Sequence, residues 1–409
     1  MQCGLLGRKL GHSYSPQIHR QLGSYSYCLF EKEPEELESF LKSGEFTGLN
    51  VTVPYKKAVI PFLDELSPQA QALGAVNTVI RKANGTLVGH NTDYYGFETM
   101  LKDSGIKVSE KKALVCGSGG ASNTVCAVLK NAGAEVIVLS RNGENNYNNL
   151  HRHLDAALIV NATPLGMYPN VQCSPIEDLR QFSHLEGVLD VVYNPARTTL
   201  LLEAEAMGLP WENGLKMLVA QAKESAQWFT GTQIPDESID KIYHQLRRQM
   251  ENIILIGMPG CGKTTVGKAL ATLTGRKVYD ADSVLEDTFQ RKIAEIIPSE
   301  GEDIFRGMES QVLEELGKLS GIILATGGGC VTKPENYRKL HRNGTIVYLQ
   351  RPVSCLPTDG RPLSHKEKME EMFRKRDPLY RKFADLSIAN QGSPEETAQK
   401  ILKALEEMA

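Results

Sequence analysis

The 409-residue sequence lacks the features of several common protein classes. No run of 18 or more apolar residues occurs, so no segment is long enough to form an apolar membrane-spanning helix. The eight cysteines form no C-x-x-C pair, which argues against a paired-cysteine zinc site and a disulfide-rich fold. The first residues also lack the apolar core of a signal peptide. Since scattered cysteines in a chain of this size are typical of reduced thiols, we expect a cytoplasmic protein.

The sequence also lacks a large excess of basic or acidic residues. Residues 1–250 hold 23 basic and 26 acidic side chains, residues 251–409 hold 23 of each, and the net charge is −3. Proteins that bind the phosphate backbone of nucleic acids are usually clearly basic. We therefore expect small-molecule substrates as partners, with neither nucleic acid nor a membrane, and the sequence leaves the oligomeric state open. At this length the chain is expected to form two or three domains.

Short runs of Val, Ile and Leu alternate with helical patterns along the whole sequence, which predicts an α/β fold of buried strands. The clearest strand candidates are residues 48–53, 113–116, 136–139, 158–160, 188–192, 253–256, 322–324 and 346–349. A strand, a glycine-rich turn and a helix follow one another at residues 113–130 and again at 253–271, which predicts two nucleotide sites. Residues 238–250 have the pattern of a closing helix, so we expect a domain boundary near residue 250 with almost no linker.

The second glycine-rich turn is a complete phosphate loop. Gly257-Met-Pro-Gly-Cys-Gly-Lys-Thr264 matches G-x-x-x-x-G-K-[ST] between an apolar strand and a helix, where the motif is functional. Backbone N–H groups of such a loop surround phosphate oxygens, Lys263 would reach the β- and γ-phosphates, and the Thr264 hydroxyl would bind Mg²⁺. The alternative is a chance glycine-rich turn. The residues expected to bind ATP here are Gly260, Cys261, Gly262, Lys263, Thr264 and Thr265.

Further motifs follow this loop in order: Asp280-Ala-Asp282, Phe305-Arg306 with Glu309, Thr326-Gly-Gly-Gly329, Gly360-Arg-Pro-Leu363 and Arg376-Asp-Pro-Leu-Tyr380. The series resembles shikimate kinase over residues 252–409. The resemblance implies that Asp280 helps to hold Mg²⁺ and that Asp282 orients the substrate hydroxyl and accepts its proton. It further implies that Arg306 and Arg376 bind the substrate carboxylate, that Gly328 approaches the ring, and that Arg361 covers ATP from a lid.

Two features of this half have other interpretations. The basic run at residues 374–382, taken alone, fits a solvent-facing helix surface better than a carboxylate site. The Pro-Leu-Tyr that follows Arg376 and the rest of the series favour the site. The lid segment, residues 351–361, is short, and it lacks an additional arginine that lids of this family often have.

The first glycine-rich turn, Gly117-Ser-Gly-Gly-Ala-Ser122, is a weak dinucleotide fingerprint because a serine replaces the third glycine. The end of the next predicted strand, Ser140-Arg141-Asn142, is more informative. A NAD site usually has an acidic residue there, whereas an arginine accommodates the 2′-phosphate of NADP. Arg141 therefore favours NADP.

The remaining motifs of the first half are Ser13-Tyr-Ser-Pro16, Asn50-Val-Thr-Val-Pro-Tyr-Lys56, Gly74-Ala-Val-Asn-Thr78, Asn91-Thr-Asp93, Asn161-Ala-Thr-Pro-Leu-Gly-Met167, Asp190-Val-Val-Tyr193 and Gly214-Leu-Lys-Met217 with Gln221. Singly they are ordinary, and a lone Lys56 is usually a surface charge. Together they resemble shikimate dehydrogenase from residue 1 to about 245. One position departs from the family pattern: Asn145 stands where a second basic residue is common, which would weaken the preference for NADP.

This second resemblance implies that Lys56 and Asp93 form an acid–base pair and that Ser13 and Ser15 bind the substrate carboxylate. It implies that the ring hydroxyls are held by Thr52, Asn77, Tyr193 and Gln221, and that Asp93 also binds the substrate. It implies a NADPH site lined by Gly117, Ser118, Gly119, Gly120, Ala121, Ser140, Arg141, Asn142, Thr163, Met167, Val191, Gly214 and Met217.

Both halves thus point to consecutive reactions of the shikimate pathway: reduction of 3-dehydroshikimate with NADPH, then phosphorylation of shikimate with ATP and Mg²⁺. We expect residues 1–250 to form the dehydrogenase, with substrate-binding parts at 1–100 and about 215–250 and a Rossmann part at about 101–214. Residues 251–409 would form a kinase of the P-loop, nucleoside-monophosphate-kinase-like class. Two alternatives are a regulatory fusion that binds these metabolites without catalysis, and a catabolic quinate/shikimate dehydrogenase that uses NAD.

Overall fold

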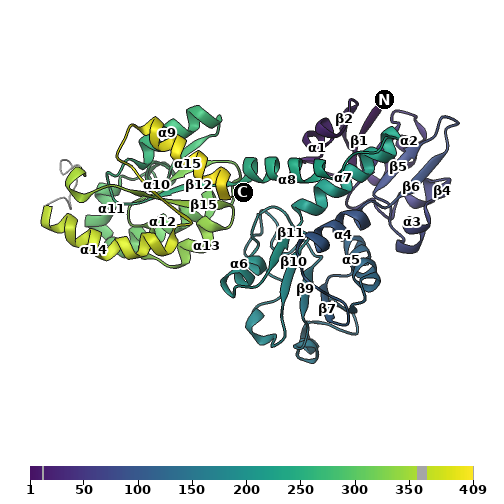
Figure 1. The fold of residues 1–409 in the computed structure, drawn as a ribbon, viewed down its shortest axis with the longest axis horizontal. Helices are drawn as coiled ribbons and strands as arrows, with labels where there is room; N and C mark the ends of the chain where they lie inside the picture. Colours follow the sequence, from purple (N-terminus) through teal and green to yellow (C-terminus); the bar gives the residue numbers. More distant parts are fainter. Residues whose placement is uncertain (12, 357–365, 409) are drawn as a thin grey trace. The chain divides into compact units, whose positions relative to one another are not determined.

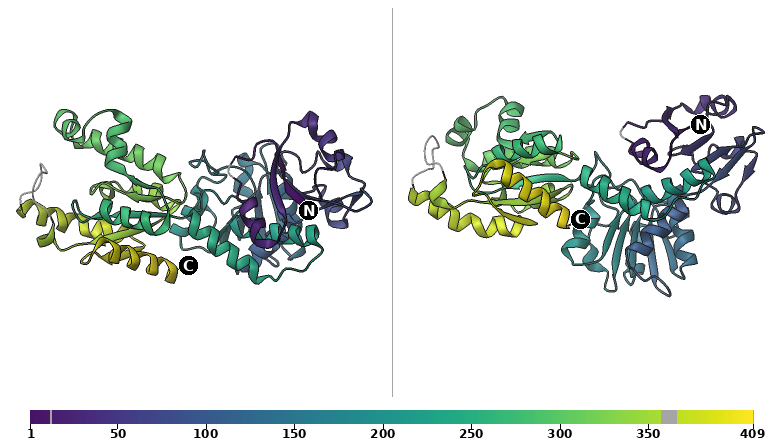
Figure 2. Two further views of the ribbon diagram at one scale, coloured as in Figure 1. Left: turned by 90° about the horizontal axis from the view of Figure 1, so that it is seen from above. Right: turned by 45° about the horizontal axis from the view of Figure 1, so that its top comes forward.

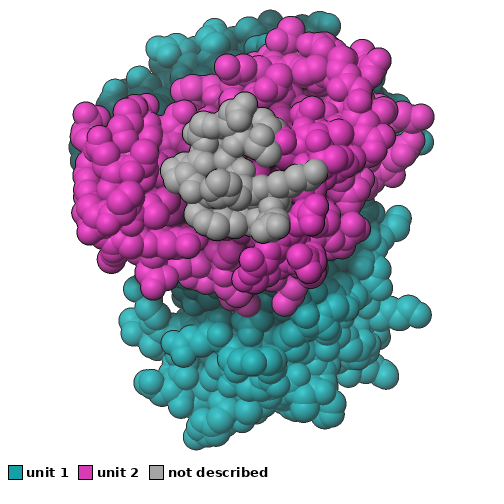
Figure 3. Space-filling view, turned by 90° about the vertical axis from the view of Figure 1, so that its left-hand side faces the viewer, with its two compact units in different colours: residues 1–193, 198–245 teal, residues 194–197, 246–409 magenta. Residues whose placement is uncertain are grey.

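The computed structural model describes residues 1–11, 13–356 and 366–408. Its contacts divide the chain into two compact units (Figure 3). Unit 1 comprises Met1–Tyr193 and Thr198–Gln245, and unit 2 comprises Asn194–Arg197 and Leu246–Ala409. Among the described residues, no helix is long and apolar enough to cross a membrane.

The first sheet of unit 1 is mixed and has the order β2-β1-β3-β5-β6-β4. Its strands are β1 (Gln2–Gly7), β2 (Ser26–Glu31), β3 (Gly48–Val51), β4 (Glu65–Leu66), β5 (Thr78–Arg81) and β6 (Leu87–His90). The helices in this stretch of chain are α1 (Ser15–Leu22), α2 (Leu37–Lys42) and α3 (Pro68–Leu73). The parallel strands β1 and β3 end side by side, with Leu6 opposite Val51, so the segments that follow them start at one edge of the sheet.

The second sheet of unit 1 is parallel throughout, in the order β11-β10-β9-β7-β8. Its strands are β7 (Lys112–Cys116), β8 (Glu135–Leu139), β9 (Leu158–Asn161), β10 (Gly187–Asp190) and β11 (Trp211–Asn213). The helices of this part are α4 (Asp93–Asp103), α5 (Gly120–Asn131) and α6 (Thr199–Ala206). The next helix, α7 (Leu215–Thr230), packs against α4 and also against α1, β3 and β5 of the first part (Figure 1). The helix α8 (Glu237–Met250) follows it.

Unit 2 contains a parallel five-stranded sheet of order β13-β14-β12-β15-β16 with helices on both of its faces (Figures 1 and 2). The strands are β12 (Asn252–Ile256), β13 (Val278–Asp280), β14 (Ile323–Ala325), β15 (Gly344–Gln350) and β16 (Leu386–Ala389). The helices are α9 (Lys263–Thr274), α10 (Ala281–Phe289), α11 (Ile293–Glu300), α12 (Glu302–Gly317), α13 (Glu335–His341), α14 (Lys366–Phe383) and α15 (Pro394–Met408).

The central strand β12 explains where this unit can bind a nucleotide. It pairs with β14 on one side and β15 on the other, in parallel, so the strands that follow it in the chain are added first on one side and then on the other. Ligands of open α/β sheets bind in the crevice at such a point. The phosphate loop follows β12 directly. The predicted α/β class is confirmed, and all eight strand candidates contain a strand.

Candidate active sites

An ion pair joins the two residues expected to act as acid and base in unit 1. The Lys56 ammonium donates to the Asp93 carboxylate, with 2.6 Å between Nζ and Oδ2. Lys56 lies in the segment after β3, and Asp93 is the first residue of α4. The Lys56 side chain is 20% exposed and that of Asp93 is 8% exposed, so the pair faces water through the lysine. A lone surface lysine, the alternative for Lys56, does not describe this position.

Asn77 and Gln221 lie in direct contact in the same unit, although 144 residues separate them. The Asn77 side chain donates to Gln221 Oε1 at 3.3 Å and accepts from the backbone N–H of Thr92 at 2.7 Å. Because Thr92 immediately precedes Asp93, this contact ties Asn77 to the start of the helix that carries the carboxylate.

The other residues expected to bind the substrate come from the segments that follow β1, β3 and β10. Ser15 opens α1, and its backbone N–H donates to the Ser13 hydroxyl at 3.2 Å. The Thr52 N–H donates to the Leu6 carbonyl at 2.9 Å, which places Thr52 beside the end of β1. Tyr193 comes from the other part of unit 1, after β10. Its ring packs edge-on against the ring of Tyr14, with 6.3 Å between the ring centroids. Tyr14 is the residue between Ser13 and Ser15 in the sequence.

The residues expected to bind NADP gather at the carboxyl edge of the second sheet. Gly117 follows β7 with φ = +111°, and α5 begins at Gly120. A Cβ on Gly119 or Gly120 would meet no atom within 4 Å, so the backbone here is open to a ligand at a helix N-terminus. At Gly214 a Cβ would lie 2.0 Å from the Val191 carbonyl oxygen, so only glycine fits. The other members of the set on this edge are Ser118, Ala121, Ser140, Arg141, Asn142, Thr163, Met167 and Met217.

Arg141 is exposed in the turn after β8, as a contact to a 2′-phosphate requires. The departure at Asn145 has a structural role, because its Oδ1 lies 2.9 Å from Nε2 of His153 and its carbonyl accepts from the Ser140 N–H at 3.0 Å. Asn145 thus shapes the turn that presents Arg141.

Asp190, at the end of β10, is a fully buried carboxyl group whose role the sequence did not reveal. It accepts from Asn161 Nδ2 and the Val192 N–H, each at 2.9 Å, and from the Thr198 hydroxyl at 2.7 Å. Burial raises the pKa of Asp190 to about 7. These bonds join the loops after β9 and β10, which carry Thr163 and Val191.

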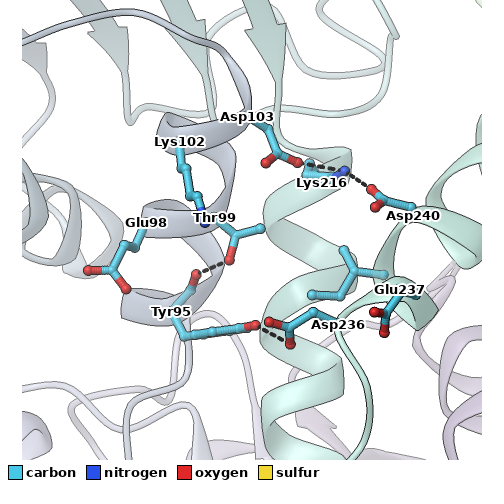
Figure 4. Close-up of a pocket in the computed structure, with 10 residues that line it drawn as sticks. Tyr95, Glu98, Thr99, Lys102, Asp103, Lys216, Asp236, Glu237 and Asp240 are labelled. Carbon is cyan, nitrogen blue, oxygen red and sulfur yellow. Dashed lines mark hydrogen bonds and ion pairs between the residues drawn. The ribbon is translucent and has the colours of Figure 1, made fainter.

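A cavity of about 640 Å³ in unit 1 is lined by charged residues of α4, α7 and α8 (Figure 4). Lys216 of α7 pairs with Asp103 of α4, at 2.6 Å, and with Asp240 of α8. The Tyr95 hydroxyl donates to Asp236 at 2.8 Å. The Lys216 ammonium of α7 thus bridges a carboxylate of α4 and a carboxylate of α8, which braces these helices against one another. The helices α4 and α7 carry Asp93 and Gln221.

In unit 2 the phosphate loop encloses its own lysine. Gly257 and Gly262 have φ of +144° and +102°, and a Cβ on Gly257 would lie 2.7 Å from the Leu349 carbonyl oxygen. Lys263 is buried and donates to the carbonyl oxygens of Gly257 and Met258, at 2.9 and 3.0 Å. Its ammonium therefore lies inside the loop, where phosphate oxygens bind. Asn390, which the motifs did not reveal, donates to the Cys261 carbonyl at 2.6 Å and supports the loop from β16.

Thr264 and Asp280 provide adjacent oxygen donors beside this loop. The Thr264 hydroxyl donates to Asp280 Oδ2 at 2.6 Å. The other carboxylate oxygen, Oδ1, caps α10 by accepting from the N–H groups of Asp282 and Ser283. One hydroxyl and one carboxylate suit Mg²⁺, which keeps several waters and takes further ligands from substrate phosphates. No cluster of three or more His, Cys, Asp or Glu suited to a metal occurs among the described residues.

A cavity of about 790 Å³ lies next to the phosphate loop. It is lined by Asp282, the predicted base, and by the two arginines predicted to bind the substrate carboxylate. The members of the predicted set that line it are Gly260, Gly262, Lys263, Thr264, Thr265, Asp280, Asp282, Arg306, Gly328 and Arg376. Arg361 lies outside the described residues.

Arg306 is held by two carboxylates, at 2.8 Å from Glu309 and 2.9 Å from Glu302. Burial raises the pKa of Glu309. Arg306 Nε and Glu309 Oε1 are buried without a hydrogen-bond partner, which fits a site that awaits a polar ligand. Arg376 donates to the Gly328 carbonyl at 3.1 Å, so the α14 arginine reaches the glycine turn after β14. A solvent-facing helix surface does not describe Arg376.

Comparison with known proteins assigns both halves. The family model of the shikimate dehydrogenase substrate binding domain matches residues 5–79, and that of shikimate kinase matches residues 259–406. Shikimate dehydrogenase (NADP(+)) of Clostridium perfringens is 34% identical over 266 residues, which cover 60% of this chain and 97% of the relative. The chain belongs to the shikimate dehydrogenase family. The two family models match separate parts of the chain, residues 5–79 and 259–406, so the chain is a bifunctional shikimate-pathway enzyme, and both resemblances seen in the sequence are confirmed.

Solved structures agree with the dehydrogenase assignment. Shikimate 5-dehydrogenase of Thermus thermophilus in complex with NADP(H) and shikimate is 33% identical, with a TM-score of 0.55, over 60% of this chain and 99% of that one. A chorismate mutase/shikimate 5-dehydrogenase fusion protein of Clostridium acetobutylicum is 35% identical, with a TM-score of 0.57, over 60% and 96% of the two chains. A shikimate dehydrogenase is thus also fused to another enzyme elsewhere.

Proposed function

We propose that the chain reduces 3-dehydroshikimate to shikimate with NADPH and then phosphorylates shikimate with ATP to shikimate 3-phosphate. The observation that carries this proposal is the presence of two built sites in one chain. The Lys56–Asp93 pair lies in a dehydrogenase, and the Lys263 loop lies in a kinase whose family acts on the dehydrogenase product.

In the dehydrogenase, NADPH supplies the hydride for the substrate ketone. The ketone oxygen gains negative charge and needs a proton, which the Lys56 ammonium donates. The Asp93 carboxylate, 2.6 Å from Nζ, holds the lysine ammonium in position. General acid catalysis of this kind contributes roughly 10²–10⁴ to the rate. Ser13 and Ser15 would bind the substrate carboxylate, and Thr52, Asn77, Tyr193 and Gln221 the ring hydroxyls.

In the kinase, ATP bound with Mg²⁺ supplies the phosphoryl group. Lys263 and the loop N–H groups would hold the phosphates, and Thr264 with Asp280 would hold the ion. Asp282 would accept the proton of the attacking hydroxyl, which frees its oxygen to bond to phosphorus. Arg306 and Arg376 would bind the substrate carboxylate, because a planar guanidinium matches it with two parallel hydrogen bonds.

We further propose the division of labour along the chain. Residues 1–250 form the dehydrogenase, in which 1–100 and about 215–250 bind substrate and about 101–214 bind NADP, and residues 251–409 form the kinase. The packing of α7 against α1, β3 and β5 supports this division. We place the enzyme in the cytoplasm, where all eight cysteines would stay reduced, as their unpaired state suggests.

The test is to supply the full chain with 3-dehydroshikimate, NADPH and Mg·ATP and to identify the products. We expect NADPH consumption and shikimate 3-phosphate, and shikimate alone when ATP is left out. A regulatory fusion would consume neither cofactor. A catabolic enzyme would instead oxidise quinate or shikimate with NAD⁺ in preference to NADP⁺.

A further inference from the structure

A cluster of buried polar side chains lies among β3, β5, α4 and α7 of the dehydrogenase, with the Ser225 hydroxyl at its centre. Ser225 is fully buried in the middle of α7. Its Oγ lies 2.7 Å from Asn50 Nδ2 and 2.9 Å from the hydroxyl oxygens of both Thr78 and Thr92. It also lies 2.8 Å from the Gln221 carbonyl oxygen. No motif in the sequence marks Ser225.

The donors and acceptors of this cluster can be assigned from their partners. Asn50 accepts through Oδ1 from the Tyr27 hydroxyl at 2.8 Å, so its amide nitrogen points at Ser225. Ser225 has one hydroxyl proton, and it donates this proton in a hydrogen bond to the Gln221 carbonyl, because a carbonyl oxygen can only accept. Ser225 then accepts from Asn50 and from a threonine hydroxyl, which fills both lone pairs of its oxygen.

The same network sets the orientation of Asn77. Its Oδ1 accepts from the Thr92 N–H, which leaves its amide nitrogen to donate to Gln221 Oε1 and to the Thr92 hydroxyl, at 3.3 and 3.0 Å. The Thr78 and Thr92 hydroxyls lie 3.1 Å apart, so one can donate to the other while that one donates to Ser225. Their remaining acceptor within reach is Asn77 Oδ1, at 3.3 and 3.2 Å. With Ser225 present, that oxygen need not serve these hydroxyls.

We propose that Ser225 is a positioning residue of the dehydrogenase, whose hydroxyl fixes Asn77, Gln221 and the start of α4 for substrate binding. The inference rests on the proposed function, since it assumes that Asn77 and Gln221 bind the substrate. Without the Ser225 hydroxyl, Asn50 loses the nearest of its acceptors. One of the two threonine hydroxyls can still donate to the other, but that other hydroxyl is left with Asn77 Oδ1 as its acceptor. The Asn77 amide is then held less firmly toward Gln221.

The first experiment compares Ser225→Ala with the wild-type full chain. We expect the KM for 3-dehydroshikimate to rise about tenfold, as for the loss of about one hydrogen bond, with a smaller change in kcat. The KM for NADPH and the kinase activity should stay unchanged. The matched control is Thr230→Val in the same helix, where the hydroxyl donates to the Ala226 carbonyl at 2.8 Å and reaches no group of this cluster. This control should leave all constants near wild type.

A second pair of variants separates the hydroxyl from packing and serves if Ser225→Ala fails to fold. The Thr92 hydroxyl lies 2.9 Å from Ser225 Oγ and accepts from the Asn77 amide at 3.0 Å, so it links the two. Thr92→Val keeps the shape of the side chain and removes its hydroxyl, whereas Thr92→Ser keeps the hydroxyl. We expect the valine variant to raise the KM for 3-dehydroshikimate and the serine variant to leave it near wild type.

An unchanged KM in folded Ser225→Ala or folded Thr92→Val overturns the proposal, and so does an equal rise in Thr92→Val and Thr92→Ser. These outcomes are distinct from failure of the proposed function, in which the wild-type chain itself would not reduce 3-dehydroshikimate.

Discussion

Removing either partner of the Lys56–Asp93 pair should have unequal effects on stability and equal effects on activity. The inequality follows from exposure, because the Lys56 side chain is 20% exposed and that of Asp93 only 8%. In Lys56→Met the carboxylate stays behind, nearly cut off from water. In Asp93→Asn the ammonium stays behind and can turn to the solvent.

The size of the difference can be worked out from the burial of each group. Breaking a fully buried ion pair costs about 3–5 kcal/mol, because an unpaired charge remains inside. Asp93 is the first residue of α4, where the helix dipole recovers about 0.3–1 kcal/mol for a carboxylate. We therefore expect Lys56→Met to lose about 2–3 kcal/mol of unfolding free energy. Asp93→Asn should lose about 1 kcal/mol, and the double variant should be more stable than Lys56→Met alone.

The assay can observe the dehydrogenase unit alone, because both tryptophans of the chain, Trp211 and Trp228, lie in unit 1. Urea unfolding followed by tryptophan fluorescence therefore reports that unit. Activity is followed by NADPH absorbance, and we expect each variant to lose roughly 10²–10⁴ in kcat/KM. Phosphorylation of shikimate by the same samples controls for protein concentration and should not change.

Two results would refute this reasoning. One is a larger loss of stability in Asp93→Asn than in Lys56→Met, because the lysine would then be the charge that cannot reach water. The other is a double variant less stable than both single variants, which would mean that packing, and not a stranded charge, dominates.

Three further predictions concern other parts of the chain. Arg306→Ala should raise the KM for shikimate about tenfold or more in the kinase assay, with little change in the KM for ATP, and equal changes in both would contradict its role at the carboxylate. Arg141→Ala should reduce the preference for NADPH over NADH about 10- to 100-fold in kcat/KM, whereas an unchanged ratio would exclude a 2′-phosphate contact. Because the pKa of Asp190 is raised from 3.8 to about 7 in the folded state, the native protein holds a proton that the unfolded chain has released, and Asp190 contributes less stability as the pH rises from about 4 to about 7. In Asp190→Asn, the unfolding free energy measured by tryptophan fluorescence should fall less over this pH range. A pH dependence equal to that of the wild type would contradict a proton held by Asp190 in the folded state.

The sequence predicted the strands that are continuous runs of Val, Ile or Leu, such as β12 and β15, because strands buried on both faces have no polar alternation. It did not predict β1, in which Gly4 and Gly7 interrupt the apolar pattern. Gly4 is there because a Cβ would lie 2.4 Å from the Phe30 ring, a contact with the neighbouring strand β2. Such a requirement depends on pairing and cannot be seen in local spacing.

The candidate sites show the same limit. The phosphate loop could be predicted because its chemistry is contained in eight consecutive residues. Asn390 supports that loop from 129 positions away, and Ser225 contacts Asn50 across 175 positions. Each is an ordinary polar residue in its local sequence. Only the fold shows which buried donor or acceptor it satisfies.

The return of α7 to the first sheet sets an order of events during synthesis. Asn50, Thr78 and Thr92 are translated 175, 147 and 133 positions before Ser225, whose oxygen they share in the folded enzyme. Until α7 leaves the ribosome, these groups lack the Ser225 hydroxyl that they share in the folded enzyme. The packing around the first sheet of unit 1 is thus completed only after the strands of the second sheet have been made. The strands of the kinase, from β12 onward, are translated after α7. Joining the kinase at this end of the chain therefore lets the dehydrogenase complete its fold before the kinase begins to fold.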